Sequence, residues 1–121
     1  MKKFIILIDA MKCPCPPIHF TIGSNAIDNF NIIDNSYDTD LWFHIGGGRS
    51  SCHVIASIPT NIVIDRKNMK YIIKQGAVLC KSHSQYASEK NVEIHYTLIK
   101  NITKTNIVGT VKLSQYSSIN I

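Results

Sequence analysis

The sequence is poor in charge, and acidic residues are especially scarce in its second half. Charged residues make up 17% of the 121 positions and hydrophobic residues 45%, a balance that excludes an intrinsically disordered chain. Residues 66–121 hold nine basic and two acidic side chains, whereas residues 1–65 hold four basic and six acidic ones. The formal charges are therefore +7 and −2. This asymmetry favours a polyanionic partner on one side of the molecule, and a positive charge that only maintains solubility is the alternative.

Long apolar runs, internal repeats and low-complexity segments are also absent from the sequence. No apolar run approaches the ~20 residues that a membrane-spanning helix needs. The short run after Lys2 and Lys3 is interrupted by Asp9 and followed by prolines without a small-residue cleavage site, so it favours a strand at Phe4–Ile8 over a signal peptide. We therefore expect one domain over residues 1–121, a cytoplasmic location and no membrane partner.

The four cysteines do not require a disulfide framework, because single-core domains of this size are normally stable without cross-links. Cys13 and Cys15 together with His19 would supply three zinc ligands. However, Cys52 and Cys80 do not form a second close pair of the kind that zinc sites show. We expect no metal and no cofactor.

Alternating apolar and polar positions predict strands before and after a single helical segment. The expected strands are Phe4–Ile8, Ile18–Ile22, Phe30–Ile33, Leu41–Ile45, His53–Ile58, Val92–Leu98, Ile107–Leu113 and Ser118–Ile121, with residues 101–106 as a connection. This order predicts an α+β fold, in which a mainly antiparallel sheet carries one long helix over about residues 66–86.

The predicted helix has a basic side next to its apolar face. Asp65 stands at the N-cap position, and no acidic residue follows it along the helix. At ~100° per residue the basic side chains share one sector, where no glutamate relieves their mutual repulsion. They are Arg66, Lys67, Lys70, Lys74 and Lys81. We expect this sector to contact phosphates.

The stretch Asp40–Ile55, with the sequence DLWFHIGGGRSSCHVI, places His44 and His53 on neighbouring strands that flank a glycine-rich loop. Both histidines would satisfy buried backbone groups, contact a phosphate or base, or take part in metal or acid–base chemistry; these alternatives stay open. The loop Gly46–Ser51 is either a hairpin turn or a backbone nest for an anion, to which Arg49 would add a bidentate donor.

Nucleophilic catalysis is not indicated by the sequence. Cys52 and His53 are adjacent on a predicted strand, so their side chains point to opposite faces and cannot readily form a nucleophile–base pair. A small metal-dependent hydrolase using His44, His53 and Asp40 remains an alternative. We expect a protein that is not an enzyme.

The segment Asp40-Leu-Trp-Phe-His44, the following glycine loop and His53-Val-Ile55 resemble the central signature of the NFACT RNA-binding domain. The resemblance extends over essentially the whole chain and is nearest to the stand-alone form found in small coiled-coil domain-containing proteins. Its further matches are Ile22-Gly23 with Asn25 and Asn29, Gly76-Ala-Val-Leu-Cys80 with Ser84, Asn91–Thr97, and Gly109-Thr-Val111. Where this chain has Ser51-Cys52, the family often has Gly-Ser.

The resemblance implies a non-enzymatic nucleic-acid-binding module that prefers RNA to DNA. Its expected partner is tRNA or ribosomal RNA of a stalled large ribosomal subunit, in ribosome quality control. A protein-interaction module that docks a partner on the Asp40–His44 sheet is the main alternative. The expected nucleic-acid-binding residues are Arg49, Arg66, Lys67, Lys70, Lys74, Lys81, His44 and His53.

Overall fold

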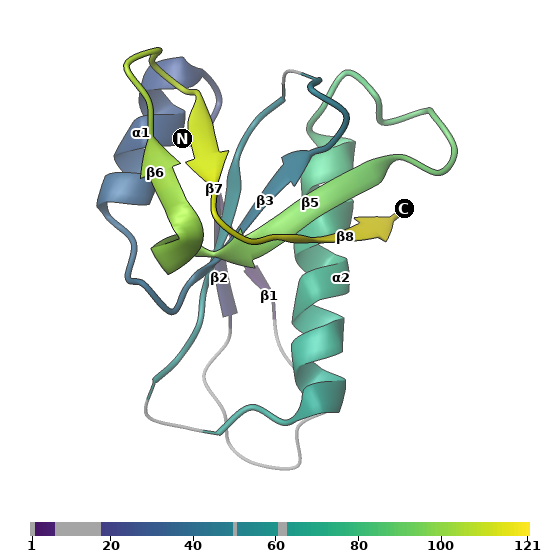
Figure 1. Ribbon diagram of the computed structural model, residues 1–121. Coiled ribbons are helices and arrows are strands. Elements are labelled where there is room, and N and C mark those ends of the chain that lie inside the picture. Colours follow the sequence, from purple (N-terminus) through teal and green to yellow (C-terminus); the bar gives the residue numbers. More distant parts are fainter. Residues whose placement is uncertain (1, 7–17, 50, 61–62) are drawn as a thin grey trace.

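The structure, a computed structural model, contains a six-stranded sheet and a separate two-stranded hairpin (Figure 1). It describes residues 2–6, 18–49, 51–60 and 63–121. In the large sheet the strand order is β1-β2-β4-β3-β5-β8, and every neighbouring pair is antiparallel. The strands of this sheet are β1 (Lys2–Ile6), β2 (Ile18–Ile22), β3 (Leu41–Ile45), β4 (Val54–Ser57), β5 (Glu93–Leu98) and β8 (Ser117–Asn120). The hairpin consists of β6 (Ile102–Lys104) and β7 (Val111–Leu113).

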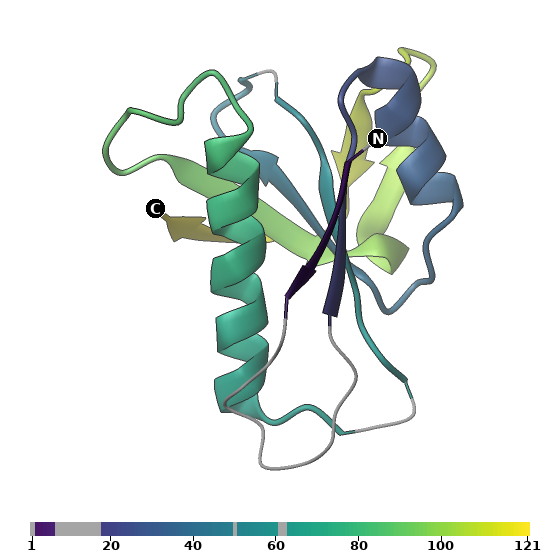
Figure 2. The same ribbon diagram turned by 180° about the vertical axis from the view of Figure 1, so that it is seen from behind.

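Two α-helices lie on opposite faces of the large sheet. Helix α2 (Arg66–Ser82) covers one face, and α1 (Ala26–Asp34) lies with the β6–β7 hairpin on the other (Figures 1 and 2). The predicted α+β class and antiparallel sheet are confirmed. The long helix ends four residues before the predicted position, because the main-chain N–H of His83 closes its last turn on Leu79 O.

Alternation along β3 divides the core between the two faces. Phe43 is fully buried on the α2 side, whereas Trp42 packs against Ile32 and Ile55 on the α1 side. The contact between α2 and β3 is close. A Cβ atom at Gly76 would lie 2.3 Å from the Phe43 ring, so only glycine allows this approach of helix to sheet.

The strand predicted at Phe30–Ile33 is wrong, because these residues belong to α1. Asn25 caps this helix by accepting a hydrogen bond from Asp28 N–H at 2.8 Å. The adjacent Ile32 and Ile33 are both buried, which suits a helix lying on a sheet but not a half-exposed strand. Residues 30–33 therefore follow the 3.6-residue period of a helix and not the two-residue period of a strand. The N-cap at Asn25 is the sequence signal that distinguishes these two structures.

The single strand predicted at Ile107–Leu113 is replaced by a hairpin. Strand β6 occupies part of the predicted connection, and β7 begins only at Val111. Gly109 lies between them with a φ of +84°, a conformation that reverses the chain and that glycine adopts without strain.

The two ends of the predicted sheet agree with the structure within its described part. The expected C-terminal edge strand is confirmed as β8, and the N-terminal strand as β1 up to Ile6. Cys13 and Cys15 lie outside the described residues. Within the residues that the structure describes, no helix has the length and apolar character needed to cross a bilayer.

Candidate functional site

The side of α2 that carries Lys67, Lys70 and Lys74 faces solvent. All three lysines are exposed, as is Arg66 at the start of the helix. None of the ion pairs among the described residues includes any of them. The carboxylate of the N-cap residue Asp65 accepts a hydrogen bond from Asn68 N–H at 2.7 Å. This carboxylate therefore caps the helix and forms no ion pair with the described lysines. Within the part of the chain that the structure describes, the helix therefore presents a row of positive charge without an acidic partner.

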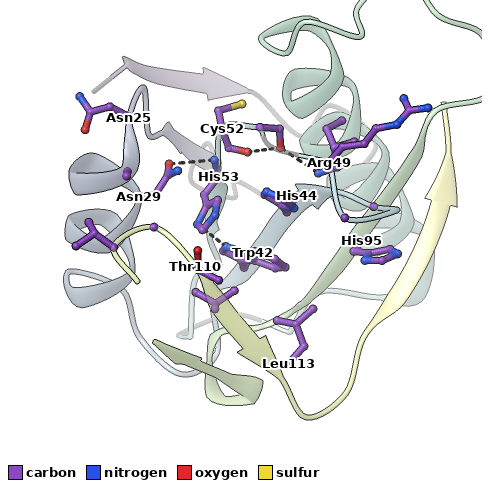
Figure 3. A pocket seen from close by; sticks show the side chains of 18 of the residues that line it. Asn25, Asn29, Trp42, His44, Arg49, Cys52, His53, His95, Thr110 and Leu113 are labelled. Carbon is purple, nitrogen blue, oxygen red and sulfur yellow. Dashed lines mark hydrogen bonds between the residues drawn. The ribbon is translucent and has the colours of Figure 1, made fainter. Parts of the chain in front are cut away.

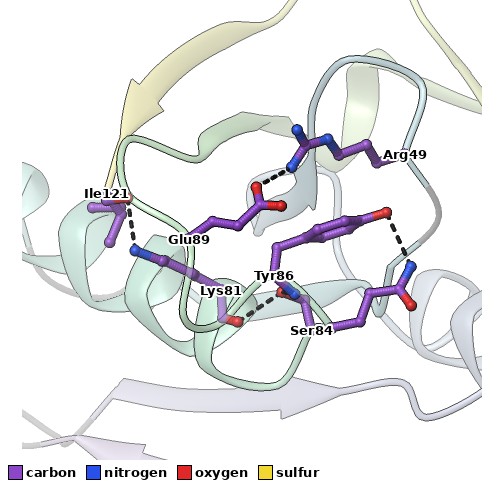
Figure 4. A network of polar contacts seen from close by, with 7 residues as sticks. Arg49, Lys81, Ser84, Tyr86, Glu89 and Ile121 are labelled. Atoms are coloured by element: carbon purple, nitrogen blue, oxygen red, sulfur yellow. Dashed lines mark hydrogen bonds and ion pairs between the residues drawn. The ribbon is translucent and has the colours of Figure 1, made fainter.

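The fifth member of the row, Lys81, differs from the others because it is half-buried. Its ammonium group donates a hydrogen bond to the main-chain oxygen of Ile121 at 3.0 Å, which fixes this side of α2 against the edge formed by β8 (Figure 4). Lys70 and Lys74 lie in the same angular sector of the helix. Lys81 therefore places the C-terminal end of the lysine row next to β8.

Arg49 does not extend the lysine row as a free cation. Its guanidinium donates to the Glu89 carboxylate at 2.7 Å and lies 4.5 Å from the centre of the Tyr86 ring (Figure 4). The hydrogen bond to Glu89 raises the pKa of Arg49 above its ordinary value. A phosphate that approached Arg49 would have to displace Glu89, so this residue is a weaker candidate than the sequence suggests.

His44 and His53 lie on the sheet face opposite α2, away from the lysine row. The His44 and His53 rings pack edge to face with centroids 5.0 Å apart, and the His44 ring stacks on Trp42. His95 of β5 is the direct cross-strand neighbour of His44. The structure thus separates the eight predicted binding residues into a helix surface, a loop arginine held by Glu89, and a histidine cluster on the other face.

The two central histidines are held in their neutral form. Burial, and to a smaller extent the nearby His44, lower the pKa of His53 to about 3. Burial is also the main cause of the lowered pKa of His44. The Nδ1 atom of His53 accepts a hydrogen bond from Trp42 Nε1–H at 3.1 Å (Figure 3). Neutral histidines offer a phosphate hydrogen bonds but no charge.

The proposed hydrolase triad does not converge. Both carboxylate oxygens of Asp40 accept main-chain hydrogen bonds, from Tyr37 N–H at 2.9 Å and Ile58 N–H at 3.0 Å. Asp40 therefore braces two loops, and its side chain is buried. Among the described residues no three histidine, cysteine or acidic side chains are placed to hold a metal ion.

The glycine loop closes a tight turn at the end of β3. Gly46 N–H continues the ladder with Glu93 O at 2.8 Å, and Gly47 and Gly48 both have φ of +72°. The side chain of Ser51 returns to β3 by accepting from Ile45 N–H at 3.2 Å. The loop forms one wall of a cavity.

This cavity has a volume of about 610 Å³ and lies on the α1 face (Figure 3). Its walls come from the start of α1, the glycine loop and the β6–β7 hairpin, and the histidine cluster forms its base. Asn29 and His95 line it but were not predicted as site residues. The N-cap at Asn25 is the sequence signal that could have identified Asn29, because a helix that starts there turns Asn29 toward the sheet.

The chain is similar to proteins of two kinds. No family model matches it. Over 90 residues, or 74% of this chain and 43% of the relative, it is 28% identical to coiled-coil domain-containing protein 25 of Danio rerio. The C-terminal part of the fibronectin/fibrinogen-binding protein from Streptococcus suis has a similar fold, with a TM-score of 0.73 and 18% identity over 97% of this chain and 44% of that chain. The chain thus spans less than half the length of either protein.

Proposed function

We propose that this chain is a non-enzymatic RNA-binding module of the NFACT RNA-binding type, which holds RNA phosphates with the exposed lysines of α2. The observation that carries the proposal is the row formed by Lys67, Lys70 and Lys74, which share one helix sector and have no acidic neighbour on the helix. Lysines in such a row act as point charges that follow a phosphate backbone without reading its sequence.

The similarity to a coiled-coil domain-containing protein supports this proposal, because the stand-alone form of the NFACT RNA-binding domain occurs in proteins of that description. The expected target is tRNA or ribosomal RNA, within ribosome quality control. Folded RNA recognised by its shape suits a surface whose contacts are lysines rather than stacked aromatic rings.

The protein-interaction alternative requires the Asp40–His44 segment to dock a partner. Leu41, Trp42 and Phe43 are buried between the two helical layers, so this segment offers no apolar surface of its own. Among the described residues, the exposed apolar side chains Ile27 and Val108 are a better protein-docking candidate. Salt-insensitive capture of a protein, without RNA binding, would favour this function.

The proposal is tested by changing Lys67, Lys70 and Lys74 together to glutamate and measuring tRNA binding between ~50 and ~200 mM salt. Each phosphate contact contributes roughly 0.7–0.9 to the slope of log affinity against log salt. Loss of three contacts should therefore make the decrease in affinity over this fourfold salt range roughly 20- to 40-fold smaller than for the wild type.

The matched control changes Lys90, Lys100 and Lys112 to glutamate. These lysines are exposed on three other segments, and the substitutions change the net charge by the same amount. The control should keep most of the salt dependence of the wild type. Equal slopes for the two triple variants would show that net charge, and not the helix surface, governs binding.

A further inference from the structure

Two polar groups of residues that line the cavity on the α1 face have no hydrogen-bond partner among the described residues. The first is Nε2 of His53, a residue that is 2% exposed. Because His53 Nδ1 accepts the Trp42 indole N–H and the ring is neutral, the ring proton must reside on Nε2. His53 therefore presents an N–H donor of fixed position.

The second group is the amide nitrogen of Asn29, a residue that is 6% exposed. The Oδ1 atom of Asn29 accepts the main-chain N–H of His53 at 3.1 Å, which fixes the orientation of the amide and leaves Nδ2 as a donor (Figure 3). This bond also brings Asn29 close to His53.

Both residues that carry these donors line the cavity. Within the described residues, no hydrogen bond uses His53 Nε2 or Asn29 Nδ2. Among the described residues, the buried side-chain polar atom without a partner is Asn68 Oδ1, which lies elsewhere in the molecule. Neither nitrogen is therefore a fully buried atom without a partner. The two nitrogens are therefore reached by solvent, and an occupant that accepts hydrogen bonds would replace that solvent.

The charge around the cavity favours a neutral occupant. No described lining residue is acidic, and the one cationic lining residue, Arg49, is held by Glu89. The positive end of α1 is already offset by Asp28, whose carboxylate accepts from Ser24 Oγ–H at 2.6 Å. A phosphate would thus find donors but no free positive charge.

The volume and lining of the cavity suit a small aromatic ligand. Its volume of about 610 Å³ is in the range of small-molecule sites, which bury most of one ligand. The His44 ring lies parallel to Trp42, with ring centroids 5.6 Å apart, and also lines the cavity. Aromatic side chains with convergent donors are the elements that hold an unstacked base in single-stranded RNA.

We propose that this cavity binds one unpaired nucleobase through its exocyclic carbonyl oxygen, which accepts hydrogen bonds from His53 Nε2–H and Asn29 Nδ2–H. Uracil and guanine have such a carbonyl, and adenine has none. The inference rests on the proposed function, because the RNA that the α2 lysines bind would be the source of the unpaired base.

The proposal is tested on the whole chain by following the side-chain N–H signals of His53 and Asn29 by NMR. The probes are uridine monophosphate, guanosine monophosphate, adenosine monophosphate and inorganic phosphate, each up to about 10 mM. Stacking of one base (about 1–3 kcal/mol) and two hydrogen bonds (about 1 kcal/mol each) together correspond to a Kd in the millimolar range or below. The uridine and guanosine nucleotides should shift both signals, and the adenosine nucleotide should bind about fivefold or more weakly.

Equal shifts with inorganic phosphate alone would overturn the proposal in favour of an anion site. Equal binding of the adenosine nucleotide would overturn the assigned carbonyl contact, and the absence of shifts with every nucleotide would overturn the site. These measurements use the wild-type chain and do not depend on a variant that folds.

Asn29→Asp provides the second arm, because it keeps the acceptor for His53 N–H and replaces the donor by a carboxylate oxygen. Binding of uridine monophosphate should fall about tenfold or more. Asn31→Asp makes the same change at an exposed position of α1 and should bind like the wild type. The lysine-to-glutamate triple variant of α2 should also keep monomer binding, so failure of the phosphate-binding surface and failure of the cavity are distinguished.

Discussion

The neutral state of buried His53 predicts a specific loss of stability in mild acid. Its pKa of about 3 in the folded protein lies below the ordinary value of 6.5 that applies in the unfolded chain. Between these two pH values, His53 is therefore protonated in the unfolded chain but neutral in the folded protein. The contribution of His53 is fully present above pH 6.5 and is lost progressively as the pH falls from 6.5 to 3.

The size of this loss follows from the two pKa values. Between pH 7 and pH 5, the linkage relation gives a decrease of about 2 kcal/mol in the free energy of unfolding from His53 alone. The lowered pKa of His44 acts in the same direction. A typical domain has only about 5–15 kcal/mol of stability, so the effect is readily measured.

The assay is urea unfolding at pH 7 and pH 5, followed by the fluorescence of Trp42, the single tryptophan of the chain. His53→Asn removes the titrating ring while keeping a side-chain oxygen near the position of Nδ1, and it should lose about 2 kcal/mol less than the wild type over this range. The matched change His19→Asn, at an exposed position of β2, controls for the removal of one histidine from the chain. If His53→Asn and the wild type lose the same stability, the neutral buried histidine is refuted.

Three further substitutions test the packing and the assignment of cations. Gly76→Ala should lower the free energy of unfolding by about 1–2 kcal/mol, because overpacking against the Phe43 ring outweighs the helix preference of alanine; an increase in Tm would contradict the close contact of α2 and β3. Asp65→Ala should cost about 1 kcal/mol through loss of the α2 N-cap, measured by urea unfolding. Arg49→Gln should leave the salt dependence of tRNA binding almost unchanged, because Glu89 already occupies the guanidinium; a decrease in slope equal to that for one α2 lysine would show that Arg49 contacts phosphate.

Several features of this protein were determined by local sequence alone. Alternation located β2 and β5, because a strand with one buried face repeats every two residues. The strands β3 and β4 were located as short apolar runs on either side of the glycine-rich loop, and both of their faces are largely buried. Asp65 and the spacing of the lysines located the start of α2 and its basic sector, because both depend only on the 3.6-residue period. The α+β class followed from the order of these elements.

Other features were decided only by tertiary structure. The run Phe30–Ile33 is apolar enough for a strand or a helix, and its packing against Trp42 and Ile55 selects the helix. The pairing of Arg49 with Glu89 joins residues 40 positions apart, and no local pattern reports it.

The cavity is the clearest case of a tertiary feature. Its walls come from three segments that are brought together by strand order and by the face on which α1 packs, neither of which the side-chain period specifies. The sequence therefore determined which residues are cationic and which are apolar. The fold determined that the lysines remain free on one side while neutral donors meet on the other, because long-range contacts, and not periodicity, set the burial of each group.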